Sequence, residues 1–249
     1  MKHDLVLNTS GRMSIVLCLD ISPSMGINNR IKNLNDAIML LYDELSGEPS
    51  VVGVVEVAVV TFSSNIEENT DFETLDFLKN KTFSVVKEGG TNLSTAVLTS
   101  IKKIEDRVLE LDNHNIDYYL PFLVLVTDGD PDQTDNQANL ETAIQSVLRH
   151  CETSKSPERL IAPYIIGVGE QVAEDALNRF AEKFTGKAII IDGDESYQRD
   201  TFKELFAFIS NSVKNSLKGA DDLKSLFVSL QKTAKTKTEL LTTNKKPRM

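Results

Sequence analysis

The 249-residue sequence has few residues of the kinds that build zinc sites or disulfide frameworks. Its two cysteines and three histidines do not show the spacing of zinc ligands, so no zinc site is expected. Cys18 falls in an expected buried strand and Cys151 near the end of an expected helix, which predicts two separate thiols. This cysteine usage is typical of a reduced compartment, and a cytoplasmic location is expected.

The sequence also lacks an excess of positive charge. Its 27 basic residues stand against 37 acidic ones, and the formal net charge is −10. That sign is wrong for binding the phosphates of DNA or RNA, so no nucleic-acid partner is expected. An acidic surface instead attracts cations and basic patches.

Long hydrophobic runs and a secretory leader are absent as well. The apolar run at 120–126 is far shorter than the roughly 20 residues that span a bilayer, and the run at 51–60 is interrupted by Glu56. No membrane association is therefore expected. Glu56 itself is assigned no function; it either faces solvent or pairs with a neighbouring base.

Apolar segments rich in β-branched residues alternate with segments of helical periodicity. Strands are expected at 14–20, 51–62, 120–127, 161–167 and 188–191, and helices at 30–46, 92–111, 136–151, 172–185 and 197–217. Near-continuous apolar strands are typical of sheets covered on both faces. The pattern predicts an α/β fold with a doubly wound, mainly parallel open sheet and helices on both faces. One antiparallel edge strand is expected near 71–75, within the polar segment 66–88.

The expected organisation is one domain with two short additions. Residues 1–12 are interpreted as an N-terminal extension, 13–218 as the domain, and 219–249 as an amphipathic helix with a mobile basic tail. The helix carries Leu223, Leu226, Phe227 and Leu230 on one face. This face is interpreted as packing against the domain, with docking to another protein as the alternative. Residues 236–249 show no helical stripe and are expected to form the tail.

Oxygen-bearing side chains occur in three segments that are expected to meet at one end of the sheet. The first strand ends in "DISPS", which places Asp20, Ser22 and Ser24 at alternate positions. Thr91 follows a glycine pair, and Asp128 comes directly after the strand 120–127. Ligands of open α/β sheets bind at the carboxyl ends of the strands, so these five side chains are expected to converge. An all-oxygen set suits Mg²⁺, with Mn²⁺ or Ca²⁺ as alternatives.

Each of these residues also has a purely structural interpretation. Ser22 and Ser24 could cap the following helix, and Asp128 could begin a turn. Asp130, Asp132 and Asp135 are interpreted as a solvated acidic rim rather than as further ligands.

The DxSxS pattern at Asp20, Ser22 and Ser24, with Thr91 and Asp128, resembles the metal-ion-dependent adhesion site of von Willebrand factor type A domains. The resemblance covers roughly residues 12–215. It implies a protein-binding module and not an enzyme. In such a module the three hydroxyls hold the metal directly or through water. The two carboxylates often act through water, and a partner's acidic residue completes the metal shell.

The segments "VEVAVVTF" and "TDGDP" are similar to segments of bacterial type A domain proteins linked to tellurium resistance. That resemblance implies a role in stress resistance or defence, with a kinase and a phosphatase as candidate partners.

Two alternatives stay open. A magnesium-dependent phosphotransferase or hydrolase would need an aspartyl nucleophile where Ser22 stands, or a GxxxxGK[ST] loop, and the sequence has neither. The second alternative is a scaffold whose metal site is purely structural.

Overall fold

The computed structural model describes residues 11–129, 135–153, 159–170, 172–218 and 223–243. Its elements are, in chain order, β1 (Met13–Asp20), the 3-10 helix η1 (Pro23–Asn29), α2 (Arg30–Ser46), β2 (Val55–Phe62), β3 (Ile66–Asn69), β4 (Glu73–Thr74), the 3-10 helix η2 (Leu75–Asn80), α3 (Leu93–Asn113), β5 (Phe122–Thr127), α4 (Gln137–His150), β6 (Ala162–Val168), α5 (Glu174–Ala181), β7 (Ile189–Ile191), α6 (Glu195–Leu217) and α7 (Leu223–Thr243).

One sheet organises these elements. Its strand order is β3-β2-β1-β5-β6-β7, with β4 also paired to β2. Strands β2, β1, β5, β6 and β7 pair in parallel, whereas β3 and β4 run antiparallel to β2. The chain moves outward from β1 to β2 and then returns to place β5 on the other side of β1. Strand order therefore reverses between β1 and β5, which is where ligand sites of such sheets form.

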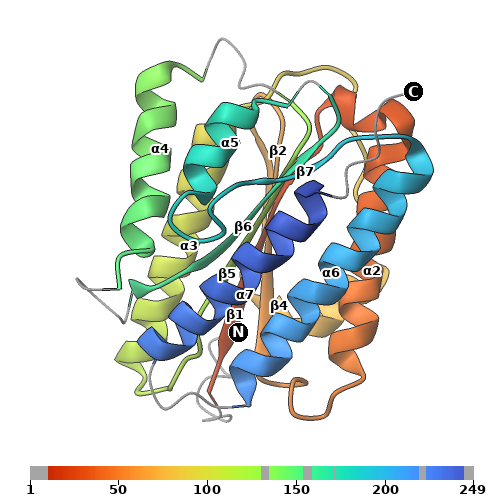
Figure 1. The fold of residues 1–249 in the computed structure, drawn as a ribbon. Helices are drawn as coiled ribbons and strands as arrows, with labels where there is room; N and C mark the ends of the chain where they lie inside the picture. Colours follow the sequence, from red (N-terminus) through yellow and green to blue (C-terminus); the bar gives the residue numbers. More distant parts are fainter. Residues whose placement is uncertain (1–10, 130–134, 154–158, 171, 219–222, 244–249) are drawn as a thin grey trace.

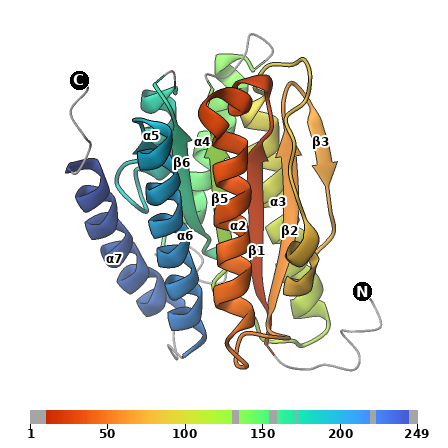
Figure 2. The same ribbon diagram turned by 90° about the vertical axis from the view of Figure 1, so that its right-hand side faces the viewer.

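Helices cover both faces of the sheet, as predicted (Figure 1). Figure 2 shows α2, α6 and α7 side by side on one face, with α3, α4 and α5 behind the sheet. Alternate side chains of β1 enter the two cores: Ile15 and Leu17 pack on the α2–α6 side, and Val16 and Cys18 on the α3–α4 side. Every residue of β1, β2, β5 and β6 is buried, which explains why these strands are almost continuously apolar. Cys18 and Cys151 are both free and buried.

The antiparallel edge differs in detail from the expectation. Instead of one strand near 71–75, β3 and the two-residue β4 share this edge. The side-chain oxygen of Thr70 accepts a hydrogen bond from the backbone N–H of Val59 at 2.9 Å. This bond takes the place of a backbone hydrogen bond to the neighbouring strand. The antiparallel edge is therefore divided there into β3 and β4. Strand β2 begins at Val55 rather than at residue 51, because 51–54 form a turn that includes Gly53 at φ +85°.

Glu56 pairs with a base rather than facing solvent. Its Oε1 accepts hydrogen bonds of 2.7 Å from Arg107 Nε on α3 and from Ser14 Oγ on β1. All three residues are buried near the amino ends of the strands. The ion pair thus ties α3 to the sheet at the end opposite the candidate site.

Helix α7 packs against the domain, which confirms the interpretation of its apolar face. Phe227 is fully buried, and its ring centroid lies 5.3 Å from that of Phe184. The expectation of a mobile tail from residue 236 is wrong for 236–243, because the helix continues to Thr243. Thr238 and Leu241 extend the buried stripe at helical spacing, and the methyl group of a threonine lets it join such a face. Residues 244–249 lie outside the described residues.

Replacement of Phe227 by alanine tests the packing of α7. Phe227→Ala removes a fully buried ring and leaves a cavity, so the free energy of unfolding should fall by about 3 kcal/mol in urea titrations. Val228→Ala, one residue along and 48% exposed, is the matched control and should change it by less than about 0.5 kcal/mol. Equal, small effects of the two substitutions would contradict the packing described.

Candidate metal-binding site

The turn after β1 brings Ser22 and Ser24 back over the edge of the sheet. Pro23 begins the 3-10 helix η1, and Asn28 and Asn29 then adopt left-handed backbone conformations with φ of 51° and 56°. Asparagine tolerates this conformation better than most residues do. The chain reverses there, and α2 begins at this end of the sheet, which is uppermost in Figure 2.

Asp20 forms the buried base of the site. Its Oδ1 accepts a hydrogen bond of 2.8 Å from the backbone N–H of Ser22, and its Oδ2 accepts one of 2.6 Å from Thr127 Oγ1. The residue is fully buried. Asp20 therefore joins the loop after β1 to the end of β5.

The two serines connect this loop to Asp128. Ser22 Oγ and Ser24 Oγ lie 3.0 Å apart, and Ser24 Oγ donates to Asp128 Oδ1 at 2.7 Å. Side chains separated by 104 residues in the chain thus meet at the boundary between β1 and β5.

Thr91 approaches the same place from the loop before α3. That loop is held to the end of β2 by a hydrogen bond of 2.7 Å from the N–H of Asn92 to the carbonyl oxygen of Ser63. A Cβ at Gly129 would come within 2.8 Å of Thr91 Oγ1. Glycine at this position therefore leaves the room that the threonine hydroxyl occupies beside Asp128.

The structure brings all five predicted side chains to the carboxyl end of the sheet. Ser22, Ser24, Thr91 and Asp128 line one open cavity of about 1000 Å³, and Asp20 lies beneath it. Helix capping by the serines does not account for this convergence, because it does not require contact with Asp128. Neither serine caps a helix: η1 begins after Ser22 without a side-chain cap bond, and Ser24 lies within it.

One residue of the expected acidic rim, Asp135, is not solvated. Asp135 is buried, and its Oδ2 accepts a hydrogen bond of 2.8 Å from the backbone N–H of Ser94. The first N–H groups of a helix have no partner within the helix, and Asp135 satisfies one of them at the start of α3. Asp130 and Asp132 lie outside the described residues.

Arg30 belongs to the site, although the sequence suggested only that it begins a helix. Its Nη1 donates to Asp128 Oδ2 at 2.7 Å, and its side chain is 10% exposed. The sequence signal nearest to Arg30 is the asparagine pair Asn28–Asn29, which marks the chain reversal just before it. The partner, however, lies 98 residues further along the chain, and local sequence does not reveal it.

The oxygen atoms of the site fit a hard divalent cation. In an octahedral Mg²⁺ site with ligands near 2.1 Å, neighbouring oxygens lie about 3 Å apart. The contacts Ser22–Ser24 and Ser24–Asp128, at 3.0 and 2.7 Å, have this spacing. Within the described residues, no three or more His, Cys, Asp or Glu side chains form a group that could hold a metal. Metal binding at this edge would therefore depend on the hydroxyls.

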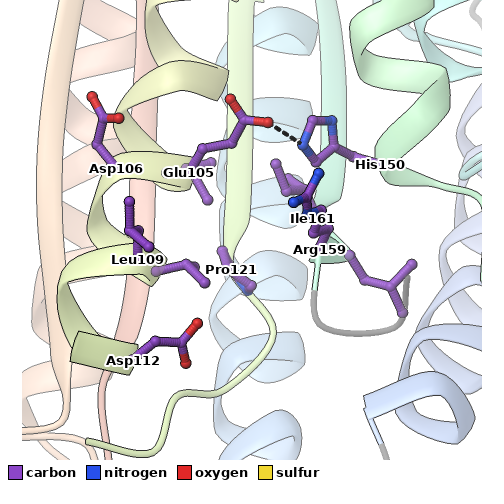
Figure 3. A pocket seen from close by; sticks show the side chains of 11 residues that line it. Glu105, Asp106, Leu109, Asp112, Pro121, His150, Arg159 and Ile161 are labelled. Carbon is purple, nitrogen blue, oxygen red and sulfur yellow. Dashed lines mark hydrogen bonds and ion pairs between the residues drawn. The ribbon is translucent and has the colours of Figure 1, made fainter. Parts of the chain in front are cut away.

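A second, smaller pocket lies at the opposite end of the sheet. It has a volume of about 330 Å³ and lies at the amino ends of β5 and β6, beside α3. Figure 3 shows Glu105 directed at His150, whose Nε2 is 3.2 Å from the carboxylate. The residues described as lining this pocket include no Ser or Thr, so it lacks the hydroxyl set of the first cavity.

A parallel α/β sheet with an oxygen-lined cavity at its switch point defines a class of ligand-binding domains. Residues 14–188 match the family model of the von Willebrand factor type A domain. The chain belongs to this family.

Solved structures share the fold at low sequence identity. The D319A mutant of the PilB minor pilin from Streptococcus sanguinis is 13% identical, with a TM-score of 0.54, and the match covers 82% of this chain and 62% of that one. The vWF domain of the type V pili tip protein Mfa5 from Porphyromonas gingivalis is 11% identical, with a TM-score of 0.53 and coverages of 82% and 97%. The pilus adhesin SpaC from Lactobacillus rhamnosus GG is 12% identical, with a TM-score of 0.54 and coverages of 84% and 31%.

The chain thus corresponds to less than two thirds of the PilB and SpaC chains. No curated protein matches the sequence. Among the described helices, none is long and apolar enough to cross a membrane.

The protonation of Asp20 gives a pH prediction for the metal-free protein. Burial raises the pKa of Asp20 from an ordinary value of 3.8 to about 6, against hydrogen bonds from Ser22 and Thr127 that lower it. The folded state therefore binds this proton more tightly than the unfolded state does. The contribution of Asp20 to the free energy of unfolding should fall as the pH rises from about 4 to about 6, and stay level above that.

Asp20→Asn removes this titration. In excess chelator at pH 7, the variant should be more stable than the wild type by on the order of 2–3 kcal/mol, and the difference should shrink toward pH 4. Urea titrations at several pH values measure it. A stability difference that stays constant between pH 4 and pH 7 would contradict the assignment.

Proposed function

We propose that this chain is a metal-dependent protein-interaction module that binds a carboxylate of a partner protein through a divalent cation. Mg²⁺ is the proposed cation, with Mn²⁺ or Ca²⁺ as alternatives. The observation that carries the proposal is the contact of Ser24 with both Ser22 and Asp128 in an open cavity that Thr91 also lines. Membership of the type A domain family supports it.

The proposed roles follow from burial and hydrogen bonding. Ser22, Ser24 and Thr91 present neutral hydroxyl oxygens to the cavity and would hold the cation directly or through water. Asp20 and Asp128 are buried beside them and supply the negative charge. A bound cation would supply a positively charged, incompletely coordinated centre for an acidic side chain of the partner. The open cavity leaves space for that side chain.

An enzymatic role has less support. General acid–base chemistry uses His most often, and the described residues that line the cavity include no His or Lys; its titratable side chains are the carboxylates of Asp128, Glu170 and Asp192 and the guanidinium of Arg30. The position that a phosphotransferase would use for an aspartyl nucleophile holds Ser22, whose hydroxyl is paired with Ser24. A binding function needs neither group.

The cellular setting is proposed from the sequence resemblance alone. We place the chain in a bacterial stress-resistance or defence system in the cytoplasm, with a kinase and a phosphatase as candidate partners. The acidic net charge of −10 favours a partner whose binding carboxylate is surrounded by basic residues.

Removal of the two serine hydroxyls tests the metal site. The double variant Ser22→Ala with Ser24→Ala should bind Mg²⁺ at least about a hundredfold more weakly than the wild type in calorimetric titrations, because it loses two proposed ligands. Ser46→Ala with Ser229→Ala, at a half-buried and an exposed helical position away from the cavity, is the matched control and should bind Mg²⁺ normally. Unchanged Mg²⁺ affinity in the site variant would reject the proposal.

A pull-down separates a metal-bridged interaction from a scaffold with a structural metal. Partner proteins should be captured in Mg²⁺ and lost in excess chelator, and the variant with both serines replaced should capture none in either condition. A partner that remains bound in chelator would identify a scaffold instead.

A further inference from the structure

The guanidinium of Arg30 lies within the proposed metal site. It lines the same cavity as the hydroxyls and is held by the 2.7 Å bond to Asp128 Oδ2. Its Nε is buried and has no hydrogen-bond partner among the described residues, which is unusual for a buried N–H group. A helix-starting residue with only a structural role does not require this placement.

The backbone at the end of β6 fixes the position of this charge. Gly169 has φ of +96°, and a Cβ there would come within 2.2 Å of Arg30 Nη2. Any other residue at 169 would therefore be strained and would clash with the guanidinium. Arg30 is held between Gly169 and Asp128, and its charge stays beside the hydroxyl cluster.

The formal charges of the site show what Arg30 changes. The carboxylates of Asp20 and Asp128 together balance the charge of one divalent cation. Asp20, Asp128, Arg30 and the cation together carry an excess of one positive charge, which a single carboxylate would neutralise. Glu170 and Asp192 also line the cavity, and their negative charges oppose the entry of a second anion.

We propose that Arg30 selects the ligand: it weakens the binding of the metal alone and strengthens the binding of one singly charged carboxylate to the loaded site. This inference rests on the proposed function. The guanidinium repels the cation and attracts the ligand, so its two effects have opposite signs. A merely structural role, in which Arg30 orients Asp128, would make metal binding weaker when Arg30 is removed.

The full chain tests both effects with simple probes. Arg30→Gln should bind Mg²⁺ about tenfold more tightly than the wild type in calorimetry, since a nearby positive charge is lost. The ligand probe is ¹³C-labelled acetate, whose carboxyl resonance is broadened when it binds Mn²⁺-loaded protein. Arg30→Gln should require about tenfold more acetate for the same broadening.

Two further variants are controls, and a third is a substitute for the test variant. Arg30→Lys keeps the charge and should stay close to the wild type for both probes. Arg30→Met removes the charge with an apolar side chain of similar length, and it replaces Arg30→Gln if that variant does not fold. Arg159→Gln makes the same charge change at the pocket in Figure 3, at the opposite end of the sheet, and should alter neither probe.

The outcomes separate the two proposals. Tighter Mg²⁺ binding with weaker acetate binding supports the role of Arg30. Unchanged or weaker Mg²⁺ binding in Arg30→Gln and Arg30→Met, beside a wild type that binds Mg²⁺, overturns that role and leaves the metal site standing. A wild type and an Arg30→Gln variant that both fail to bind Mg²⁺ would contradict the metal site, and this inference with it.

Discussion

The contact between Ser24 and Asp128 is the interaction on which the candidate site depends. It joins the loop after β1 to the end of β5, across the point where strand order reverses. At this point the loops of two neighbouring strands leave in opposite directions, so a cavity forms between them. The parallel sheet, buried on both faces, holds the two strand ends at a fixed spacing. The fold therefore positions the oxygens before any ligand binds.

The electrostatics of the site follow from its burial. Asp20 and Asp128 are both almost fully buried, and two carboxylates so close to one another need compensation. Hydrogen bonds from Ser22 and Thr127 serve Asp20, whereas Ser24 and Arg30 serve Asp128. The raised pKa of Asp20, about 6, shows that this compensation is incomplete for the buried group. A site that retains unbalanced negative charge in its base is suited to a cation.

The sheet, the helices on both faces and the convergence of the five oxygen-bearing residues could be predicted from the sequence. Periodicity and strand ends are local signals. Arg30 could not be found in this way, since its role depends on Asp128 and Gly169, which follow it by more than ninety residues. Asp135 has the sequence surroundings of a solvated acid, but it is buried because α3 begins beside it. The segment 236–243 shows no apolar helical stripe in the sequence, because its buried face includes the polar residue Thr238. In each case the tertiary neighbour, not the local pattern, decides the role.

The most direct test of the central claim is anomalous diffraction from crystals of the protein grown with Mn²⁺. The account predicts one strong peak within coordinating distance of the hydroxyl oxygens of Ser22 and Ser24, with Thr91 and Asp128 beside it. No peak at this edge of the sheet at saturating Mn²⁺, or a peak only at another place on the molecule, would contradict the account.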